Sequence, residues 1–313
     1  MRTQKIWRDG YFVDWPDATI HVLSHAVHYG SSVFEGIRCY KTPQGGAIFR
    51  LRDHIRRLVD SSRIYRIQLP HSLDALVHAC VDTVAANDLE ECYLRPIVVR
   101  TGERMGVLPE DRPGAVETFI IAWKWGQYLG DDALARGVDV CVSSWRRAAP
   151  DTYPTLAKAG GNYLNGQLSL LEARANGYVE GIMLDAAGFV SEGTGENIFV
   201  ARDGVVYTPP ISAGILGGIT RDTVMHLVAD QGHEVREQLI PREFLYMADE
   251  IFFSGTAAEI TPVRSVDHIQ VGEGKPGPIT KAVQDRYLGI ARGRYPDPYG
   301  WLTPVPEPAV AAR

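Results

Sequence analysis

The spacing of hydrophobic positions predicts several amphipathic helices along the chain. Apolar side chains recur at helical intervals in four segments, which cover residues 52–64, 72–87, 163–176 and 220–231. Gly177 and Gly232 follow the last two segments and are expected to end them, because glycine readily adopts the left-handed conformation found after a helix. Thr220 is a natural residue to cap the start of the fourth helix.

Shorter apolar runs, bounded by turn residues, predict strands. They lie at residues 47–52, 92–100, 117–125, 137–144, 181–185, 189–192, 197–201, 205–208 and 250–254. Pro96 indicates an edge position or a bulge in the second of these strands, since proline cannot donate to the hydrogen-bond ladder. The order of elements is mixed α and β without steady βαβ alternation, and Gly193-Thr-Gly195 lacks the third glycine of a dinucleotide-binding fingerprint.

Length and composition indicate a globular protein of two domains. The chain has 313 residues, of which 45% are hydrophobic and 22% charged, and a single core rarely grows beyond roughly 250–300 residues. A stretch rich in glycine and aspartate at residues 126–137 is interpreted as a linker between a small N-terminal α/β domain, 1–125, and a larger strand-rich C-terminal α/β domain, 138–313. The tail from residue 295 is rich in proline and alanine and is expected to be loose at its end.

Charge and cysteine content exclude several classes of partner. The net charge is −6 and no basic stripe is present, so neither a nucleic acid nor a membrane is expected as a partner. Residues 1–15 lack the apolar run of a signal peptide, and no stretch approaches the ~18 apolar residues of a membrane span. The four cysteines contain no CxxC pair, which favours a reduced, cytoplasmic protein.

Lys158 is the first candidate for chemistry. It is one of six lysines and lies in Pro154-Thr-Leu-Ala-Lys158-Ala-Gly-Gly-Asn-Tyr163, among small residues that would let a planar group approach. A desolvated lysine can lose its proton near neutral pH and attack an aldehyde. The alternative is an ordinary loop lysine before a helix, and the local pattern leaves both interpretations open.

Three other segments could bind anions or a heterocycle. Free backbone N–H groups at Gly217-Gly-Ile219-Thr220, before a helix, could hold an anion, and Ser254-Gly-Thr256-Ala-Ala-Glu259 offers a second run of small residues. Glu192 stands at the end of a hairpin, where a carboxylate facing a pyridine nitrogen would keep that nitrogen protonated. A plain turn and cap, a tight turn and a solvated loop acid are the respective alternatives.

Taken together, these segments resemble the branched-chain aminotransferases of the class IV, fold type IV pyridoxal-phosphate family. The resemblance extends from about Ile6 to Trp301 and rests on blocks in the family's order, at residues 21–30, 33–40, 148–150, 158–163, 191–197, 218–222 and 254–262. It implies a two-domain mixed α/β fold, pyridoxal 5'-phosphate as the cofactor and no metal ion. It also implies a ping-pong transamination between L-leucine, L-isoleucine or L-valine and 2-oxoglutarate, as used in the biosynthesis of these amino acids.

The resemblance also implies roles for individual residues around the cofactor. Lys158 would form the Schiff base and carry the proton, Glu192 would pair with the pyridine nitrogen, and Tyr163 would bind the phenolic oxygen. Arg57 is preferred over its neighbour Arg56 for the phosphate, because the family places this arginine directly before a leucine. The remaining cofactor contacts would be Gly195, Ile219, Thr220 and Thr256.

On the substrate side, the resemblance implies an apolar pocket with a charged rim. Its walls would be Phe34, Met105, Val107 and Trp125. Tyr93 and Arg95 lie two apart on one strand and so share a face, and Arg95 would bind the distal carboxylate of glutamate with Tyr29, from a neighbouring subunit, and Tyr128. The remaining substrate contacts would be Gly36, Arg38, Thr256, Ala257 and Ala258.

Several alternatives remain at this point. The same family contains D-amino-acid aminotransferases, amine transaminases and aminodeoxychorismate lyase, and a non-catalytic cofactor-binding protein is an interpretation from another class. The sequence does not fix the preference among leucine, isoleucine and valine, since one methylene is worth only ~1–3 kcal/mol in an apolar pocket. A homodimer or higher homo-oligomer with shared active sites is expected from the resemblance.

Overall fold

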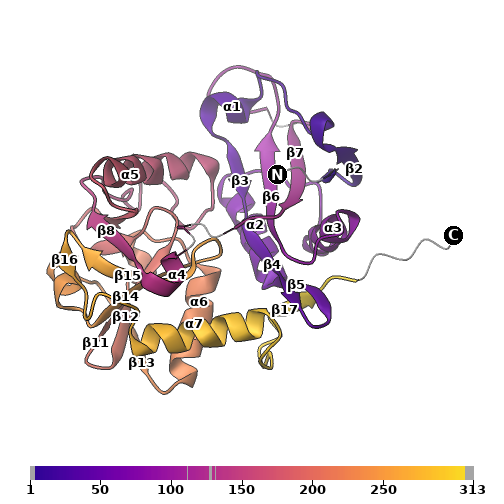
Figure 1. Cartoon of the computed structure of the whole chain (residues 1–313). Helices are drawn as coiled ribbons and strands as arrows, with labels where there is room; N and C mark the ends of the chain where they lie inside the picture. The colour runs from indigo at the N-terminus through magenta and orange to yellow at the C-terminus, as the bar shows by residue number, and fades with distance from the viewer. Residues whose placement is uncertain (1–3, 111, 127–128, 131, 307–313) are drawn as a thin grey trace. The chain divides into compact units, whose positions relative to one another are not determined.

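The fold was analysed in a computed structural model that describes residues 4–110, 112–126, 129–130 and 132–306. The chain forms two compact units (Figure 1). The first, unit 1, comprises residues 1–125, 157–161 and 289–313, and the second, unit 2, comprises residues 126–156 and 162–288. The segment interpreted as a linker contains α4 (Ala133–Arg136), and the division into functional domains stays a prediction.

A sheet of eight strands forms the centre of unit 1. Its order is β17-β5-β4-β6-β7-β1-β2, and β3 pairs with β6 beside β4. The strands are β1 (Lys5–Arg8), β2 (Tyr11–Asp14), β3 (Ser32–Phe34), β4 (Ile37–Thr42), β5 (Gly45–Phe49), β6 (Cys92–Arg100), β7 (Val116–Trp123) and β17 (Leu302–Pro304). β17, in the proline-rich tail, pairs with β5 and is ordered in this sheet. The end of the tail, predicted to be loose, includes residues 307–313, which lie outside the described residues.

Strand β6 coincides with the predicted strand, but the edge position inferred from Pro96 is wrong. β6 lies between β7 on one side and β3 and β4 on the other. Pro96 sits where the partner changes from β4 to β3, and its carbonyl accepts a hydrogen bond from the Glu35 N–H at 2.8 Å. The N–H that proline lacks therefore faces an interruption in the neighbouring strand and not a continuous ladder.

Two amphipathic helices supply the core of unit 1. α2 (Leu51–Ile64) buries Leu51, Ile55 and Leu58, and α3 (Leu73–Ala86) buries Leu76, Cys80 and Val84 in the same cluster. Both helices were predicted, but the strand expected to reach residue 52 ends at Phe49, because Arg50 adopts a left-handed conformation (φ 53°) and the helix follows at once. The other helices of this part are α1 (His25–Tyr29) and a 3-10 turn at Trp15–Asp17.

Unit 2 is built on a sheet of nine strands. The order is β10-β9-β8-β15-β14-β11-β12-β13, with β16 beside β15, and the β8–β9, β8–β15 and β12–β13 pairs are parallel. The strands are β8 (Val138–Val142), β9 (Glu180–Leu184), β10 (Val190–Glu192), β11 (Asn197–Arg202), β12 (Val205–Thr208), β13 (Glu234–Glu237), β14 (Glu250–Gly255), β15 (Glu259–Val266) and β16 (Ile269–Gln270).

The long helices of this part of the chain are α5 (Tyr163–Ala175), α6 (Ile219–Asp230) and α7 (Pro278–Ala291), with 3-10 turns at Gly160–Asn162, Ile211–Ala213 and Arg242–Met247. α5 ends as predicted, with Gly177 in the left-handed region. The capping role predicted for Thr220 is wrong: Gly218 occupies the cap position, and Thr220 is already the second helical residue. A Cβ on Gly218 would lie 1.9 Å from the side-chain oxygen of Asn197, so a capping side chain cannot fit there.

The cysteines and the apolar character of the helices bear on the expected surroundings of the chain. All four cysteines are buried free thiols there. No helix in the described ranges has the length and apolar character that crossing a bilayer requires.

Candidate active site

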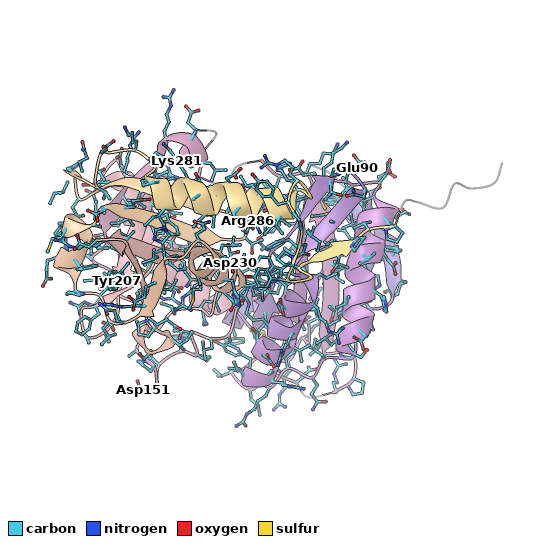
Figure 2. All side chains as sticks on the ribbon, turned by 90° about the horizontal axis from the view of Figure 1, so that it is seen from below. Glu90, Asp151, Tyr207, Asp230, Lys281 and Arg286 are labelled. Atoms are coloured by element: carbon cyan, nitrogen blue, oxygen red, sulfur yellow. The ribbon has the colours of Figure 1, made fainter. Side chains whose placement is uncertain are left out.

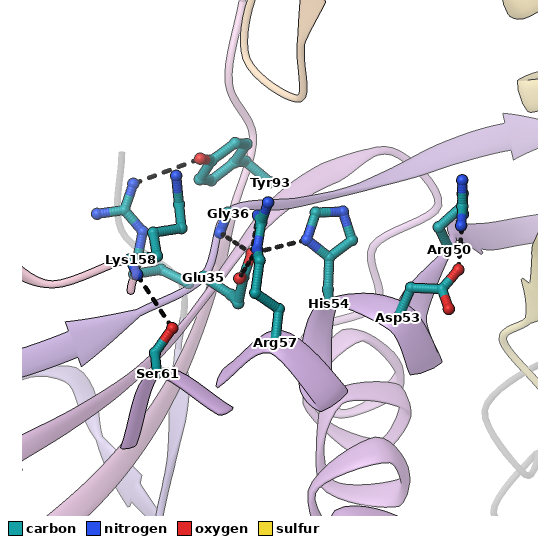
Figure 3. Close-up of polar contacts among 10 residues, drawn as sticks. Glu35, Gly36, Arg50, Asp53, His54, Arg57, Ser61, Tyr93 and Lys158 are labelled. Carbon is teal, nitrogen blue, oxygen red and sulfur yellow. Dashed lines mark hydrogen bonds and ion pairs between the residues drawn. The ribbon is translucent and has the colours of Figure 1, made fainter. Parts of the chain in front are cut away.

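The backbone around Lys158 is held by two elements of unit 1. The Lys158 N–H donates to Ser61 Oγ on α2 at 3.0 Å (Figure 3), and the Lys158 carbonyl accepts from the Phe34 N–H on β3 at 3.0 Å. The ammonium Nζ lies 5.2 Å from the centre of the Phe34 ring. Ser61 is fully buried, so this lysine is anchored on the core of the unit and is not part of a free loop.

The other lysines have surroundings typical of surface residues. Three of them form ion pairs with carboxylates, Lys5 with Asp14, Lys41 with Glu90 and Lys275 with Glu273. Lys124 and, on α7, Lys281 (Figure 2) are exposed. The half-buried Lys158, packed against an aromatic ring, therefore differs from each of them.

Arg57 belongs to a buried ionic group that the sequence analysis missed. Its Nε and Nη2 donate to the two oxygens of Glu35 at 2.6 and 2.9 Å, and Nδ1 of His54 lies 2.7 Å from Glu35 Oε2 (Figure 3). Burial alone would raise the pKa of Glu35, but the charge of Arg57, together with His54, outweighs it and holds that pKa far below the ordinary value. Burial lowers the pKa of His54, which favours its neutral form as a hydrogen-bond donor to Glu35.

The ambiguity between Arg56 and Arg57 has a structural counterpart. Arg57 is largely buried and fixed by Glu35, whereas Arg56 is exposed and lines a surface hollow together with Arg52, Arg63 and Arg66. This difference favours Arg57 for a role inside the protein, and its contact with a phosphate stays a prediction.

Strand β6 presents Tyr93 and Arg95 on one face, as their spacing predicted. Arg95 Nη2 lies 3.4 Å from the Tyr93 hydroxyl, and its guanidinium stands 4.5 Å from the centre of the Phe34 ring. The Arg95 Nε is buried and has no hydrogen-bond partner within the described parts of the chain. A buried donor without a partner is costly, so this atom fits a site that receives an acceptor from a ligand.

Gly36 and Arg38 flank the same tyrosine. A Cβ on Gly36 would lie 1.8 Å from the Tyr93 hydroxyl, so only glycine fits. Arg38 is buried on β4 and pairs with Tyr93 across the sheet. Trp125 packs edge-on against Tyr93, with ring centres 4.4 Å apart. Gly36, Arg38, Tyr93 and Trp125 are thus brought together in unit 1.

The remaining predicted pocket residues of unit 1 are not buried within it. Tyr29 is 41% exposed, Met105 is 52% exposed and Val107 is 82% exposed. The Tyr29 hydroxyl accepts a hydrogen bond from the Gly106 N–H at 3.1 Å, which ties α1 to the loop that carries Met105 and Val107. Tyr128 lies outside the described residues.

In unit 2, Glu192 is a buried acid with fixed partners, so the alternative of a solvated loop acid is wrong. A register shift in the β9–β10 pairing precedes it, and bulges of this kind often redirect side chains next to functional sites. Its Oε2 accepts from Asn197 Nδ2 and from the Leu216 N–H, both at 3.0 Å, and its Oε1 lies 2.8 Å from Nη2 of Arg147. Arg147 was not identified from the sequence, although it directly precedes the Ala148-Ala-Pro block.

The two candidate anion segments of unit 2 have suitable local geometry. The helix α6 starts at Ile219, directly after Gly218, a residue without a capping side chain, and Thr220 is buried in its first turn. Thr256, Ala257 and Ala258 form the turn between β14 and β15, and Glu259 closes it in a left-handed conformation (φ 53°). Strained backbone of this kind clusters at ligand sites.

The last two predicted cofactor contacts occupy loop and helix-start positions of unit 2. Tyr163 is half-buried at the first residue of α5. Gly195 is exposed, and its N–H donates to Glu196 Oε2 at 3.1 Å. The predicted residues thus fall into one group in unit 1, around Lys158 and Arg95, and another in unit 2, around Glu192, α6 and the β14–β15 turn.

Comparisons with known proteins place the chain in a class. The profile of the family described as "Amino-transferase class IV" matches residues 32–266, and the chain belongs to this family.

Individual relatives are similar to the chain over nearly its whole length. A branched-chain-amino-acid aminotransferase of Salmonella typhimurium is 54% identical over 309 residues, which cover 97% of this chain and 99% of that protein. The crystal structure of the Escherichia coli branched-chain amino acid aminotransferase is 52% identical and superposes with a TM-score of 0.94 over 97% of this chain and 100% of that one. The T.th. enzyme in complex with N-(5'-phosphopyridoxyl)-L-glutamate is 42% identical, with a TM-score of 0.93 over 98% and 100%.

Proposed function

We propose that the chain transfers amino groups between L-leucine, L-isoleucine or L-valine and 2-oxoglutarate, with pyridoxal 5'-phosphate as its cofactor. The observation that carries this proposal is Lys158, a lysine anchored by Ser61 and packed on Phe34, in a chain whose 54%-identical relative is a branched-chain aminotransferase. The D-amino-acid, lyase and non-catalytic alternatives are not favoured by the relatives.

The residues present fit this cofactor. An aldehyde needs a primary amine, which Lys158 supplies, and a pyridine nitrogen needs an acid, which the buried Glu192 supplies. A phosphate needs cations and N–H donors: Arg57 supplies the charge, and the start of α6 and the Thr256 turn supply backbone N–H groups. When bound, the cofactor serves as an electron sink for the bond broken at the α-carbon of the amino acid.

The protein's own residues then have separate tasks. Lys158 moves a proton to and from the substrate α-carbon, since it is the half-buried amine at the site. Glu192 presents a negative charge to the ring nitrogen, and Tyr163 donates to the ring oxygen. The phosphate side of the cofactor is held by Arg57, Ile219, Thr220, Thr256 and Gly195.

The substrate side must accept both an apolar side chain and a carboxylate. The apolar wall is formed by Phe34, Trp125, Met105 and Val107. Arg95, with Tyr29 and Tyr128, binds the distal carboxylate of glutamate, and Tyr93 shares the face of Arg95. The buried Arg95 Nε without a partner in the described residues supports this role, as does the glutamate moiety in the complex of the T.th. enzyme. The backbone of Gly36 and of Thr256, Ala257 and Ala258 would face the α-carboxylate, and Arg38 would be a further substrate contact.

A homodimer or larger homo-oligomer with Tyr29 contributed across an interface is part of this proposal. Leu164, Leu168 and Leu171 lie at helical spacing on α5 and are 61%, 41% and 67% exposed. Exposed apolar faces of this kind mark association surfaces, and a second copy of the chain is the proposed occupant. A cytoplasmic location is also proposed, supported by the four free thiols.

A substrate panel tests the function. Purified protein with pyridoxal phosphate is expected to convert L-leucine, L-isoleucine and L-valine with 2-oxoglutarate. The rates should differ among the three by no more than about 200-fold, since leucine and isoleucine are isomers and valine is smaller by one methylene. Glutamate formation is measured for the L- and D-amino acids in parallel. Faster turnover of D-amino acids, or release of pyruvate from aminodeoxychorismate without an amino acceptor, would reject the proposal.

Replacing Arg95 with methionine is expected to separate the two half-reactions. The loss for 2-oxoglutarate should be ~1.5–3 kcal/mol, the range for a hydrogen bond to a charged group. The loss for leucine should be much smaller, because leucine has no distal carboxylate. Single-turnover rates with glutamate and with leucine measure the difference, and equal losses would mean that Arg95 supports the fold or the α-carboxylate instead.

A further inference from the structure

We infer that Arg147 is a positioning residue that keeps Glu192 ionised and so keeps the proton on the cofactor's ring nitrogen. This inference rests on the proposed function of Glu192 and adds a second residue to it.

The two carboxylate oxygens of Glu192 accept from different kinds of donor. Oε2 accepts from two neutral groups, the Asn197 amide and the Leu216 N–H. Oε1 is paired with the guanidinium of Arg147 at 2.8 Å. The two side chains of this ion pair are only 10% and 8% exposed, so water screens their attraction little.

The position of Arg147 is itself fixed by unit 2. Its N–H donates to the Leu184 carbonyl at the end of β9 at 2.8 Å, and its Nε donates to the Gly214 carbonyl at 3.4 Å. Gly214 has φ 73°. The guanidinium therefore reaches Glu192 from a backbone anchored next to the strand pair that carries this acid.

The chemistry follows from competition for one proton. A buried carboxylate without a charged partner prefers its neutral form, and it would then take the proton that the ring nitrogen needs. A guanidinium in direct contact favours the ionised carboxylate, and because arginine stays charged at all ordinary pH values, the effect is constant. The ring consequently retains its positive charge and its capacity as an electron sink.

The test compares Arg147→Met and Arg147→Lys in the holoenzyme. Arg147→Met is expected to slow the leucine half-reaction by about 10- to 100-fold. This is the range seen when a residue that orients a directly contacting side chain by a hydrogen bond is removed. The midpoint of the pH titration of the cofactor's visible absorbance should also shift upward, because a ring without positive charge lowers the pKa of the titrating group on the cofactor less. Arg147→Lys should restore most of both properties, since it keeps the charge.

Two further variants make the outcome specific. In the hydrogen bonds of the described residues, the side chain of the neighbouring Arg146 contacts only the carbonyls of Asp185 and Ala186, so Arg146→Met should leave the rate and the titration unchanged. In a Glu192→Gln background, Arg147→Met should produce no further upward shift, because the acid through which it acts is gone. Such non-additivity is the signature of residues that act as a unit.

The failures are distinguishable. If Glu192→Gln alone leaves the half-reaction and the titration unchanged, the proposed role of Glu192 is wrong. If Glu192→Gln alters both but Arg147→Met alters neither, or if Arg147→Lys behaves like Arg147→Met, the inference about the charge of Arg147 is overturned.

Discussion

Replacing Lys158 with alanine is expected to abolish transamination, with a loss on the order of 10⁶-fold, the scale found when an essential nucleophile is removed. The amine is positioned over the Phe34 ring while its backbone is fixed by Ser61 and Phe34, so no other described lysine can replace it without moving the chain. The visible absorbance of the protein-bound cofactor should disappear together with the activity.

A chemical experiment identifies the residue directly. Borohydride reduction of the wild-type holoenzyme should leave the cofactor attached to the peptide that contains Lys158, as measured by mass spectrometry. Lys124→Ala and Lys281→Ala are matched controls on exposed lysines and should retain activity and absorbance. An adduct on either of these peptides in the wild type would contradict the assignment.

Elements with a strong local signal could be predicted from the sequence. Strand β6 is largely apolar, α3 starts with a Ser72 side chain that accepts from the Ala75 N–H at 3.2 Å, and α5 ends before a glycine. The helix α7 was missed although Val283, Tyr287 and Ile290 are buried at helical spacing. Strand β13 (Glu234–Glu237) was missed for another reason: its residues are mostly exposed and polar, and only pairing with β12 orders them.

The candidate site likewise contains residues with a sequence signal and residues without one. Lys158, Glu192 and Arg95 have the residue type that the proposed chemistry requires, so motif and resemblance could indicate them as candidates. Arg147 could not be inferred, because its partner Glu192 is 45 positions away along the chain and side-chain pairing at that distance leaves no spacing signal. The Glu35–His54–Arg57 group was missed for the same physical reason, since only the folding of α2 onto the connection between β3 and β4 brings its members together.

Replacing Glu35 with glutamine is expected to destabilise the protein by about 3–5 kcal/mol, the cost of leaving one partner of a buried ion pair uncompensated. Glu35 is fully buried and accepts hydrogen bonds from Arg57 and from His54. Glutamine has one acceptor oxygen and an NH₂ group, so one of these donors would face another donor. Cofactor retention should fall as well, because Arg57, the proposed phosphate ligand, loses the carboxylate that orients it.

A surface ion pair serves as the control for this variant. Glu90 pairs with Lys41 at 2.5 Å, but the two side chains are 56% and 61% exposed. Glu90→Gln is therefore expected to cost no more than about 1 kcal/mol, the usual upper range for an exposed pair. Urea unfolding of the three proteins at pH 7, without and with added cofactor, measures both the stability and the contribution of the bound cofactor.

The pH dependence of the Glu35→Gln effect follows from the sign of the pKa shift. The pKa of Glu35 in the folded protein lies far below its ordinary value of 4.5, because Arg57 and His54 outweigh the effect of burial. The unfolded chain therefore binds this proton first as the pH falls, and the stabilisation by Glu35 is complete above pH 4.5 and declines below it. The glutamine variant has no such group, so the difference in unfolding free energy between wild type and variant that is due to the carboxylate should narrow as the pH falls below 4.5. A difference that stays constant down to pH 3, or a loss no larger than that of Glu90→Gln at pH 7, would show that the carboxylate does not stabilise the fold through its charge.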